Sequence, residues 1–286
     1  MSSIPADKME CMEVWGGNQP VNRMLTTTGL DIWAYSKPHA GSRSGGDVYY
    51  ISSCSSGRIT RLLLADVSGH GEVVAARANI LRKLMRRHIN HINQASLVEA
   101  INRDFEAESR TGSFATAVIG TYFAPTKSLT ICNAGHPPPL IYRAQSGTWF
   151  PFGGEQDSTS IKRNFPLGIS VGQNFTNQAC RLDPEDLVIC FTDGLLEFKQ
   201  SDNSMLGESG LLQILSQLDP HRPDCLIQEL IQRLDPDQKK INSADDASIV
   251  LFRRNNESVS LMDNLAAPFR ALKHYLNRAE SEASES

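Results

Sequence analysis

Four aspartate-bearing turns are the part of this sequence whose residue types and spacing could do chemistry. Each turn adjoins an apolar run typical of a buried strand. The turns are Gly45-Gly46-Asp47, Asp66-Val67-Ser68-Gly69-His70, Thr192-Asp193-Gly194 and Asp245-Asp246. An aspartate beside a glycine is first of all turn chemistry, so a single turn of this kind carries little weight. Carboxylates at the ends of apolar runs are costly unless they are paired or bind a cation, so the four turns together favour a shared site.

Carboxylate oxygens suit hard divalent cations such as Mg²⁺ and Mn²⁺, and glycines let an ion approach the backbone closely. The sequence offers no rival nucleophile, because its six cysteines stand singly without a phosphate-cradling loop. Ser68 lacks the Gly-x-Ser-x-Gly elbow of α/β hydrolases. His70 has two readings of equal weight, as the proton donor to a leaving alkoxide and as a cap of the following helix.

Alternating and continuous apolar runs predict the strands that carry these turns. The expected strands are 30–35, 48–53, 59–67, 114–123, 128–133, 140–143, 176–182, 187–192 and 247–253. From residue 72 to about residue 92 the apolar period becomes 3.6, which predicts a helix. The apolar stripe of that helix is Val74, Ala78, Leu81, Met85, Ile89 and Ile92.

Three more helices are expected, at 96–107, 211–218 and 224–234. Ser96 and Glu99 have the spacing of a capping box, which predicts that Ser96 is the N-cap of the first of these. Many strands with few helices do not follow the βαβ rhythm of a doubly wound fold. They favour packed sheets with helices outside.

The two ends of the chain differ from its middle. Residues 1–28 are predicted to be an N-terminal arm or an extra edge element, and residues 29–254 to form one domain. Residues 255–286 are predicted to be an amphipathic helix with an acidic tail. Its apolar stripe is Leu261, Leu265, Phe269, Leu272 and Leu276. Docking of this helix on its own domain is the favoured interpretation, and a homodimer or partner contact is the alternative.

Composition narrows the class of protein. The 286 residues, 40% of them hydrophobic, can bury one large core or two modest ones, and a net charge of −4 argues against bulk nucleic-acid binding. The basic run between 82 and 91 is read as a solvated helix face. No apolar stretch is long enough for a membrane helix, and the N-terminus lacks the pattern of a secretion signal. The sequence has no Cys-x-x-Cys pair, so a zinc site is not expected. A reduced, cytoplasmic protein is expected.

The order of the motifs resembles a known family. The sequence reads G-G-D-V-Y from Gly45, D-V-S-G-H-G from Asp66, N-A-G-H-P-P-P-L from Asn133, T-D-G-L-L-E from Thr192 and D-D-A-S from Asp245. This series is similar to the SpoIIE-like metal-dependent serine/threonine protein phosphatases, the bacterial branch of the PPM family, over roughly residues 28–254. The resemblance implies an α+β fold, an αββα sandwich of two packed sheets flanked by helices. It also implies a two-metal site at one end of the sandwich.

The resemblance also implies site residues. Asp47 and Asp66 would hold the pair of Mn²⁺ or Mg²⁺ ions, with Asp66 bridging them and the backbone carbonyl of Val67 joining. Asp193 would be a further ligand. The pair Asp245 and Asp246 would supply one more, with Asp245 as the first choice.

Two ions about 3.5–4 Å apart lower the pKa of a bridging water and neutralise a phosphoryl oxygen, so that hydroxide attacks phosphorus in line.

Three further residues in or near the motifs have no defined role. His136 marks the family without an assigned role, and Tyr50 stands where many members have an aspartate. Arg43 could contact the substrate phosphate, but a solvated loop arginine is the favoured interpretation.

The function expected from the resemblance is hydrolysis of phosphoserine or phosphothreonine on a regulatory protein. By analogy, that protein is an anti-sigma-factor antagonist of a partner-switching circuit. Two alternatives stay open: a non-catalytic partner-binding module of the same fold, and a hydrolase of small phosphate esters. Retention of all four aspartate turns argues against the first alternative.

Overall fold

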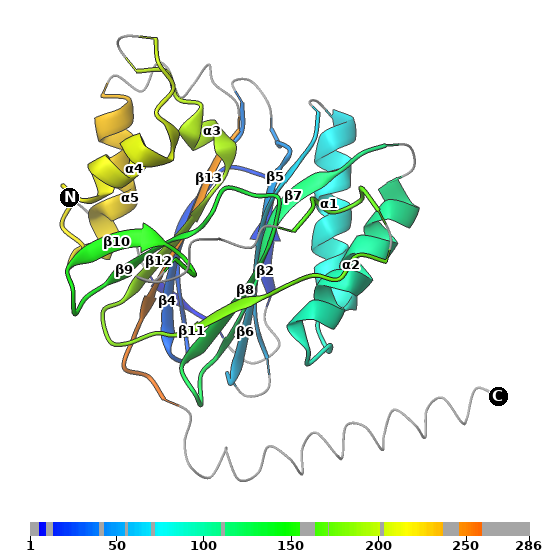
Figure 1. Cartoon of the computed structure of the whole chain (residues 1–286), viewed down its shortest axis with the longest axis horizontal. Helices are drawn as coiled ribbons and strands as arrows, with labels where there is room; N and C mark the ends of the chain where they lie inside the picture. The colour runs from blue at the N-terminus through cyan, green and yellow to red at the C-terminus, as the bar shows by residue number, and fades with distance from the viewer. Residues whose placement is uncertain are drawn as a thin grey trace.

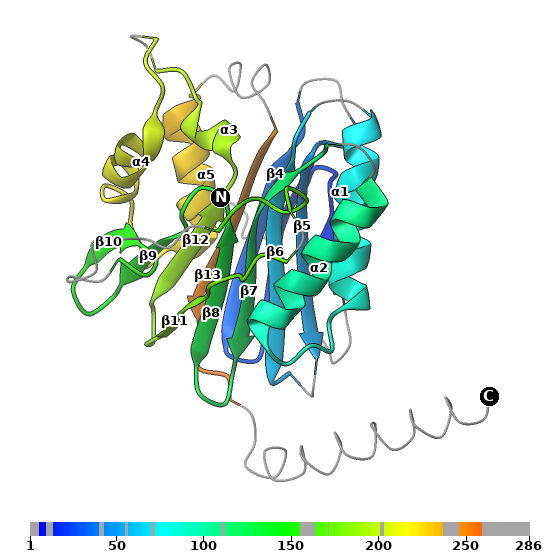
Figure 2. The same ribbon diagram turned by 45° about the vertical axis from the view of Figure 1, so that its right-hand side comes forward.

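The computed structural model describes residues 6–9, 14–39, 43–54, 57–69, 72–109, 112–154, 164–170, 172–200, 203–236 and 246–258. Two sheets pack face to face, and helices cover both outer faces (Figures 1 and 2). Every neighbouring pair of strands is antiparallel except β1 and β3, which run parallel. The predicted αββα sandwich is confirmed.

The seven-stranded sheet carries three helices on its outer face (Figure 1). Its strands, in spatial order, are β1 (Ala6–Lys8), β3 (Val21–Thr27), β4 (Leu30–Lys37), β13 (Ala247–Arg254), β12 (Leu187–Phe191), β9 (Leu140–Arg143) and β10 (Thr148–Pro151). The helices are α3 (Asp193–Leu196), α4 (Gly207–Leu215) and α5 (Pro223–Leu234). Apolar side chains of these helices pack on outward-facing residues of β12 and β13, such as Ile189 and Leu251.

The six-stranded sheet carries the two longer helices, which lie side by side on its outer face (Figure 2). Its strands, in spatial order, are β11 (Gln178–Arg181), β8 (Ser128–Ala134), β7 (Ala115–Phe123), β6 (Ile59–Val67), β5 (Asp47–Cys54) and β2 (Val14–Gly17). The helices are α1 (Glu72–Arg87) and α2 (Gln94–Ser109). Between the two sheets lies a third apolar layer, formed by inward residues such as Ile51, Leu64 and Val188.

The predicted strands at 59–67 and 140–143 match β6 and β9 residue for residue. Helix α1 is shorter than expected, because it ends at Arg87 and a turn follows. Val74, Ala78, Leu81 and Met85 of the predicted stripe are buried, but Ile92 is 91% exposed. The prediction was wrong for Ile92, since the chain leaves the helical path before reaching it.

Strand β10 was not assigned from the pattern, and residues 1–28 were predicted only as an arm or an extra edge element, without strand limits. β10 lies in the Gly- and Ser-rich stretch and pairs with β9. β2 and β3 add an outer strand to β5 and to β4, so residues 14–27 take part in both sheets.

The predicted C-terminal stripe from Leu261 to Leu276 lies outside the described residues. None of the helices in the described ranges is long and apolar enough to cross a membrane.

Helix α2 begins two residues earlier than the capping-box pattern predicted. The side chain of Asn93 accepts a hydrogen bond from the backbone N–H of Ser96 at 3.1 Å, which is the geometry of an N-cap. Ser96 therefore lies in the first turn, and its predicted role as the cap was wrong.

The cap assignment has a measurable consequence. Asn93→Ala should lower the free energy of unfolding by about 1 kcal/mol, because a first-turn N–H group loses its acceptor. Ser96→Ala, the matched control, should change it by less than about 0.5 kcal/mol, because Ser96 is exposed. Denaturant unfolding of both variants decides between them, and a larger loss for Ser96→Ala would restore the sequence prediction.

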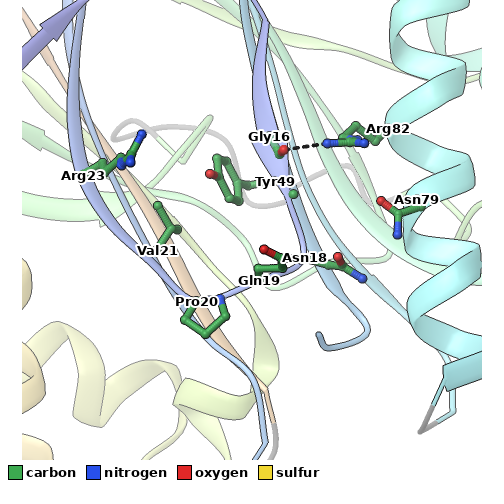
Figure 3. A pocket seen from close by; sticks show the side chains of 10 residues that line it. Gly16, Asn18, Gln19, Pro20, Val21, Arg23, Tyr49, Asn79 and Arg82 are labelled. Atoms are coloured by element: carbon green, nitrogen blue, oxygen red, sulfur yellow. Dashed lines mark hydrogen bonds between the residues drawn. The ribbon is translucent and has the colours of Figure 1, made fainter. Parts of the chain in front are cut away.

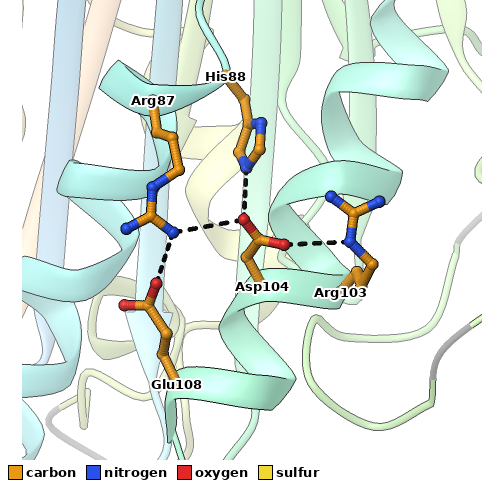
Figure 4. Close-up of polar contacts among 5 residues, drawn as sticks. All are labelled: Arg87, His88, Arg103, Asp104 and Glu108. Atoms are coloured by element: carbon orange, nitrogen blue, oxygen red, sulfur yellow. Dashed lines mark hydrogen bonds and ion pairs between the residues drawn. The ribbon is translucent and has the colours of Figure 1, made fainter. Parts of the chain in front are cut away.

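The basic run on α1 is only partly solvated, which corrects the sequence interpretation. His88 Nε2 lies 2.8 Å from a carboxylate oxygen of Asp104 on α2, and Arg87 donates to Glu108 at 2.6 Å (Figure 4). Arg103 reaches Asp104 from the same helix at 3.1 Å. These contacts tie the C-terminal end of α1 to α2.

Candidate metal centre

The candidate site forms where inward-facing rows of the sandwich change from apolar to polar. In a strand, every second residue points to the same face. In β5, Ile51 and Tyr49 belong to the layer between the sheets, and Asp47 is the next residue on that face. In β6, Leu64 belongs to the same layer and Asp66 follows it. The two carboxylates therefore extend the interior core at one end of the sandwich.

Asp47 and Asp66 are direct register partners across the β5–β6 ladder. Residues opposed in this way have Cβ atoms about 4.5–5.5 Å apart, and like charges at such positions repel. Asp47 is only 3% exposed. Burial, followed by the charge of Asp66, raises the pKa of Asp47 well above its ordinary value. The folded chain thus holds two carboxylates where an unneutralised pair is unfavourable.

Strands of the opposite sheet fix the orientation of Asp47. The Thr192 hydroxyl donates to Asp47 Oδ2 at 2.8 Å and accepts from the backbone N–H of Ser248 at 2.9 Å. The Ser248 hydroxyl in turn donates to Ser36 at 2.8 Å. This chain of hydrogen bonds links β5 to β12, β13 and β4 across the sandwich. Thr192 and Ser248 lie within the sequence motifs, but the motifs assigned them no role. The signal that could have identified them is a hydroxyl side chain at the end of an otherwise apolar row.

Asp246 anchors the turn that leads to Asp47. One of its carboxylate oxygens accepts from the backbone N–H of His39 at 2.6 Å. The other accepts from the backbone N–H of Gly46 at 2.5 Å and of Asp47 at 3.4 Å. Both oxygens are thereby engaged with backbone donors. These contacts indicate that Asp246 positions the turn that carries Asp47.

The glycines before Asp47 are required by close contacts. A Cβ atom on Gly45 would lie 2.3 Å from the Asp246 carboxylate. A Cβ atom on Gly46 would lie 3.1 Å from the carbonyl oxygen of Val67 and 3.4 Å from Asp66 Oδ1. The turn therefore brings the backbone of Gly46 against the main-chain oxygen that the sequence proposed as a ligand.

The structure brings Asp47, Asp66, the Val67 carbonyl and Asp246 together around one turn. Asp193 starts α3 directly after Thr192, so its backbone is held one residue from the contact with Asp47. The predicted residues His70 and Asp245 lie outside the described residues. Within the described part of the chain, no three His, Cys, Asp or Glu side chains gather closely enough to hold one ion.

Two further residues named from the sequence, Arg43 and Tyr50, lie in different surroundings. Arg43 is described and exposed. Tyr50 is fully buried in the apolar layer beneath α1 and α2, on the face of β5 opposite Asp47. The residue that replaces the frequent family aspartate therefore packs into the core and does not face the site.

The donor set fits a divalent cation. Asp47 is surrounded by two other carboxylates and by hydroxyls, and the charges of Asp66 and Asp246 disfavour its ionised form. A bound dication would instead favour the ionised form of Asp47. Carboxylate and carbonyl oxygens are the ligands that Mg²⁺ and Mn²⁺ prefer.

A family model described as Stage II sporulation protein E (SpoIIE) matches residues 56–255. The chain belongs to the SpoIIE family. A curated relative of this SpoIIE-family chain is the phosphoserine phosphatase RsbU of Bacillus subtilis (strain 168), 23% identical over 229 residues. The match covers 79% of this chain and 63% of RsbU, so the chain spans less than two thirds of that relative's length.

Solved structures support the same fold. The RsbU and RsbW domains of Rv1364c from Mycobacterium tuberculosis align with a TM-score of 0.67 at 23% identity, over 91% of this chain and 72% of that one. The PP2C phosphatase domain of SpoIIE from Bacillus subtilis, solved with a fragment of its regulatory domain, aligns at 0.64 and 17%, over 86% and 65%. RsbX, solved in complex with magnesium, aligns at 0.60 and 15%, over 82% and 100%.

The histidine of the N-A-G-H-P motif in this SpoIIE-family chain contacts β7, the strand paired with Asp66. His136 is 1% exposed, and its Nδ1 lies 2.8 Å from the hydroxyl of Thr116, the register partner of Asp66 on β7. Asn133 fixes its backbone by accepting from the His136 N–H at 2.8 Å and donating to the His136 carbonyl at 2.9 Å. Burial lowers the pKa of His136 to about 3, against the opposing effect of backbone groups of Phe191 and Thr116. A neutral imidazole therefore buttresses the strand next to Asp66.

The buried neutral His136 predicts a pH-dependent stability. The unfolded chain takes up a proton near pH 6.5, whereas folded His136 does so only near pH 3. Its contribution is therefore complete above pH 6.5 and falls by about 1.4 kcal/mol per pH unit below it. Between pH 6.5 and pH 5 the loss is about 2 kcal/mol. The raised pKa of Asp47 adds a slope of opposite sign in any metal-free variant, so the difference from His136→Gln is the quantity to measure. In urea unfolding, the wild type should lose stability below pH 6.5 more steeply than His136→Gln by this amount; equal slopes would contradict a buried neutral histidine.

Proposed function

We propose that this chain is a metal-dependent protein serine/threonine phosphatase that hydrolyses phosphoserine or phosphothreonine on a regulatory protein. The observation that carries the proposal is the opposed pair Asp47 and Asp66 at the end of the sandwich, in which Asp47 is buried and oriented by Thr192. The resemblance of the motifs and the family membership support the reaction class. RsbU, a phosphoserine phosphatase, supports the substrate class.

In the proposed site, Asp47, Asp66, the Val67 carbonyl, Asp193 and Asp245 hold two Mg²⁺ or Mn²⁺ ions. When bound, these ions supply an activated water and neutralise a phosphoryl oxygen of the substrate. The protein itself provides orientation: Thr192 fixes one oxygen of Asp47, so the carboxylate does not have to reorganise when it binds an ion. In the same proposal, His70 protonates the leaving serine or threonine oxygen.

A rim of exposed apolar side chains supports a protein substrate. Phe114 is 40% exposed, and Ser68, directly after Val67, holds its backbone. The Ser68 N–H donates to the Phe114 carbonyl, and the Phe114 N–H donates to the Ser68 hydroxyl. Phe165 and Ile169 are 66% and 50% exposed and flank the backbone bridge to Ala115. Large side chains kept in water beside a polar site suit contact with another macromolecule better than with a small ester.

The proposed partner is a phosphorylated regulatory protein of the partner-switching type, such as an anti-sigma-factor antagonist. The solved Mycobacterium tuberculosis chain, which joins RsbU and RsbW domains, supports this class. We place the protein in the cytoplasm, because Cys132, Cys190 and Cys225 are free thiols. We also propose a phosphatase domain at 29–254, to whose two sheets residues 14–27 add strands, and a homodimer through the C-terminal segment.

The test compares a phosphorylated antagonist protein with p-nitrophenyl phosphate over a titration of Mn²⁺ and Mg²⁺. Both activities should require metal, stop on chelation and survive thiol capping, because Cys132 and Cys190 are buried. Turnover of the ester without turnover of any phosphoprotein would favour a small-ester hydrolase. Binding without turnover would favour a non-catalytic module, and full activity in metal-free buffer would overturn the metal site.

Phe165→Ser tests the role of the rim. It should lower kcat/KM for the phosphoprotein about tenfold, as for loss of one apolar interface contact, and leave hydrolysis of p-nitrophenyl phosphate unchanged. Met205→Ser is the matched control, because Met205 is equally exposed, at 62%, but lies in the segment before α4. An equal effect of both substitutions, or none, would remove the rim from substrate binding.

A further inference from the structure

A polar pocket of about 340 Å³ lies between the β2–β3 connection, β5 and α1 (Figure 3). Arg23 comes from β3, Tyr49 from β5, and Asn79 and Arg82 from α1. The connection itself contributes the segment from Gly16 to Pro20. No residue that lines the pocket is acidic, although the chain as a whole carries a net charge of −4.

Two positive charges in this pocket lack a carboxylate partner. Arg82 donates to the carbonyl oxygen of Gly16 at 2.8 Å, and the guanidinium of Arg23 lies 5.1 Å from the ring centre of Trp15. Within the described residues neither side chain forms an ion pair, whereas Arg87, Arg143 and Arg253 do. Each uses a carbonyl or an aromatic ring, which leaves its charge uncompensated.

Both guanidinium groups contribute to the electrostatic potential at Tyr49. Figure 3 shows Tyr49 between Arg23 and Arg82, with the arginines on opposite sides of the pocket. Burial raises the pKa of Tyr49, and the charges of both arginines oppose that effect, so both reach the phenol electrostatically. The pocket therefore concentrates positive potential over hydroxyl and amide groups that can also bind an anion.

We propose that this pocket is a phosphate-binding site, separate from the candidate metal centre, in which Arg23 and Arg82 supply positive charge from opposite sides. The planar fork of arginine matches phosphate oxygens, and Asn79, Gln19 and Tyr49 offer further donors. The phosphate is carried either by a small molecule or by a phosphoserine of a protein, and the two probes used in the titration separate these sources.

The pocket is joined to the turn that carries Asp47. Asn18, which lines the pocket and is 4% exposed, donates to the carbonyl of Gly45 at 3.1 Å and to that of Ala75 on α1 at 3.1 Å. Its own carbonyl accepts from the backbone N–H of Gly45 at 2.9 Å. A ligand that orders this segment also orders the turn two residues before Asp47, which makes the site regulatory.

The test is a calorimetric titration of the metal-free full chain with inorganic phosphate and, separately, with O-phosphoserine. Without metal, the result does not depend on the proposed catalytic function. One saturable, salt-sensitive site is expected, and Arg23→Ala and Arg82→Ala should each weaken binding about tenfold or more. Arg58→Ala, which removes an arginine stacked on Phe123 at 5.7 Å, is the matched control and should bind as the wild type does.

Tighter binding of O-phosphoserine would assign the site to a phosphoprotein, and tighter binding of inorganic phosphate would assign it to a free ion; either supports the site. Absence of saturable binding, or unchanged binding by Arg23→Ala, overturns it. Arg23 is exposed, so this variant stays informative if Arg82→Ala, which also loses the contact with Gly16, does not fold.

Hydrogen exchange tests the connection to the metal turn. Phosphate should slow exchange of the Gly45 and Gly46 amides in the wild type and in Arg58→Ala, but not in Arg23→Ala. Phosphate binding without any change at these amides would overturn the regulatory connection.

Discussion

Asp66→Asn should lower turnover by on the order of 10³-fold and should raise the stability of the metal-free chain. Turnover falls because an amide neither balances the charge of a divalent ion nor bridges two ions well. Stability rises because the substitution removes a charge opposed to Asp47 across the β5–β6 ladder. A rise in Tm of about 2–4 °C corresponds to about 1 kcal/mol in a chain of this size.

Asp31→Asn is the matched control for Asp66→Asn. Asp31 is also a strand aspartate, but Arg253 donates to its carboxylate at 2.8 Å. Loss of this paired charge should lower Tm and leave the turnover of folded protein unchanged. Thermal melts in chelator and assays at saturating Mn²⁺ measure both effects. A lower Tm for metal-free Asp66→Asn would contradict repulsion between the two carboxylates.

Asp246→Asn should weaken metal binding about 10–100-fold and leave much of the turnover at saturating metal. The reason is geometric, because Asp246 accepts from backbone donors of His39, Gly46 and Asp47. An asparagine keeps one acceptor oxygen and turns an NH₂ group toward a backbone N–H, so the turn before Asp47 loosens. Excess metal can compensate for a loosened turn, whereas it cannot replace a missing ligand.

Asp245→Asn provides the comparison for Asp246→Asn. If Asp245 is the ligand, as the resemblance implies, its variant should stay inactive at every metal concentration. Activity titrated with Mn²⁺ for the two variants separates a change in half-saturating concentration from a change in maximal rate. Recovery of Asp245→Asn but not of Asp246→Asn at high metal would exchange the two assignments.

The sequence alone determined the strands that carry the site and the turns in which the site residues lie. A continuous apolar run placed the strand at 59–67 correctly, and the Gly45-Gly46-Asp47 turn had a local signal in its glycines. Such features depend on neighbours a few residues away, so a local pattern is sufficient to predict them. The ordered series of motifs also indicated the family, and with it the αββα fold.

The tertiary structure decided how distant residues act on one another. The register that opposes Asp47 to Asp66, the Thr192–Asp47 hydrogen bond across 145 residues and the Asp246–Gly46 contact across 200 residues have no local pattern. Arg61 makes the same point, since it lies 2% exposed in a predicted apolar strand. It is accommodated there because Gln94 and Thr121 accept its hydrogen bonds. The free energy of burying a charged or polar group depends on partners that only the folded chain brings within hydrogen-bonding distance.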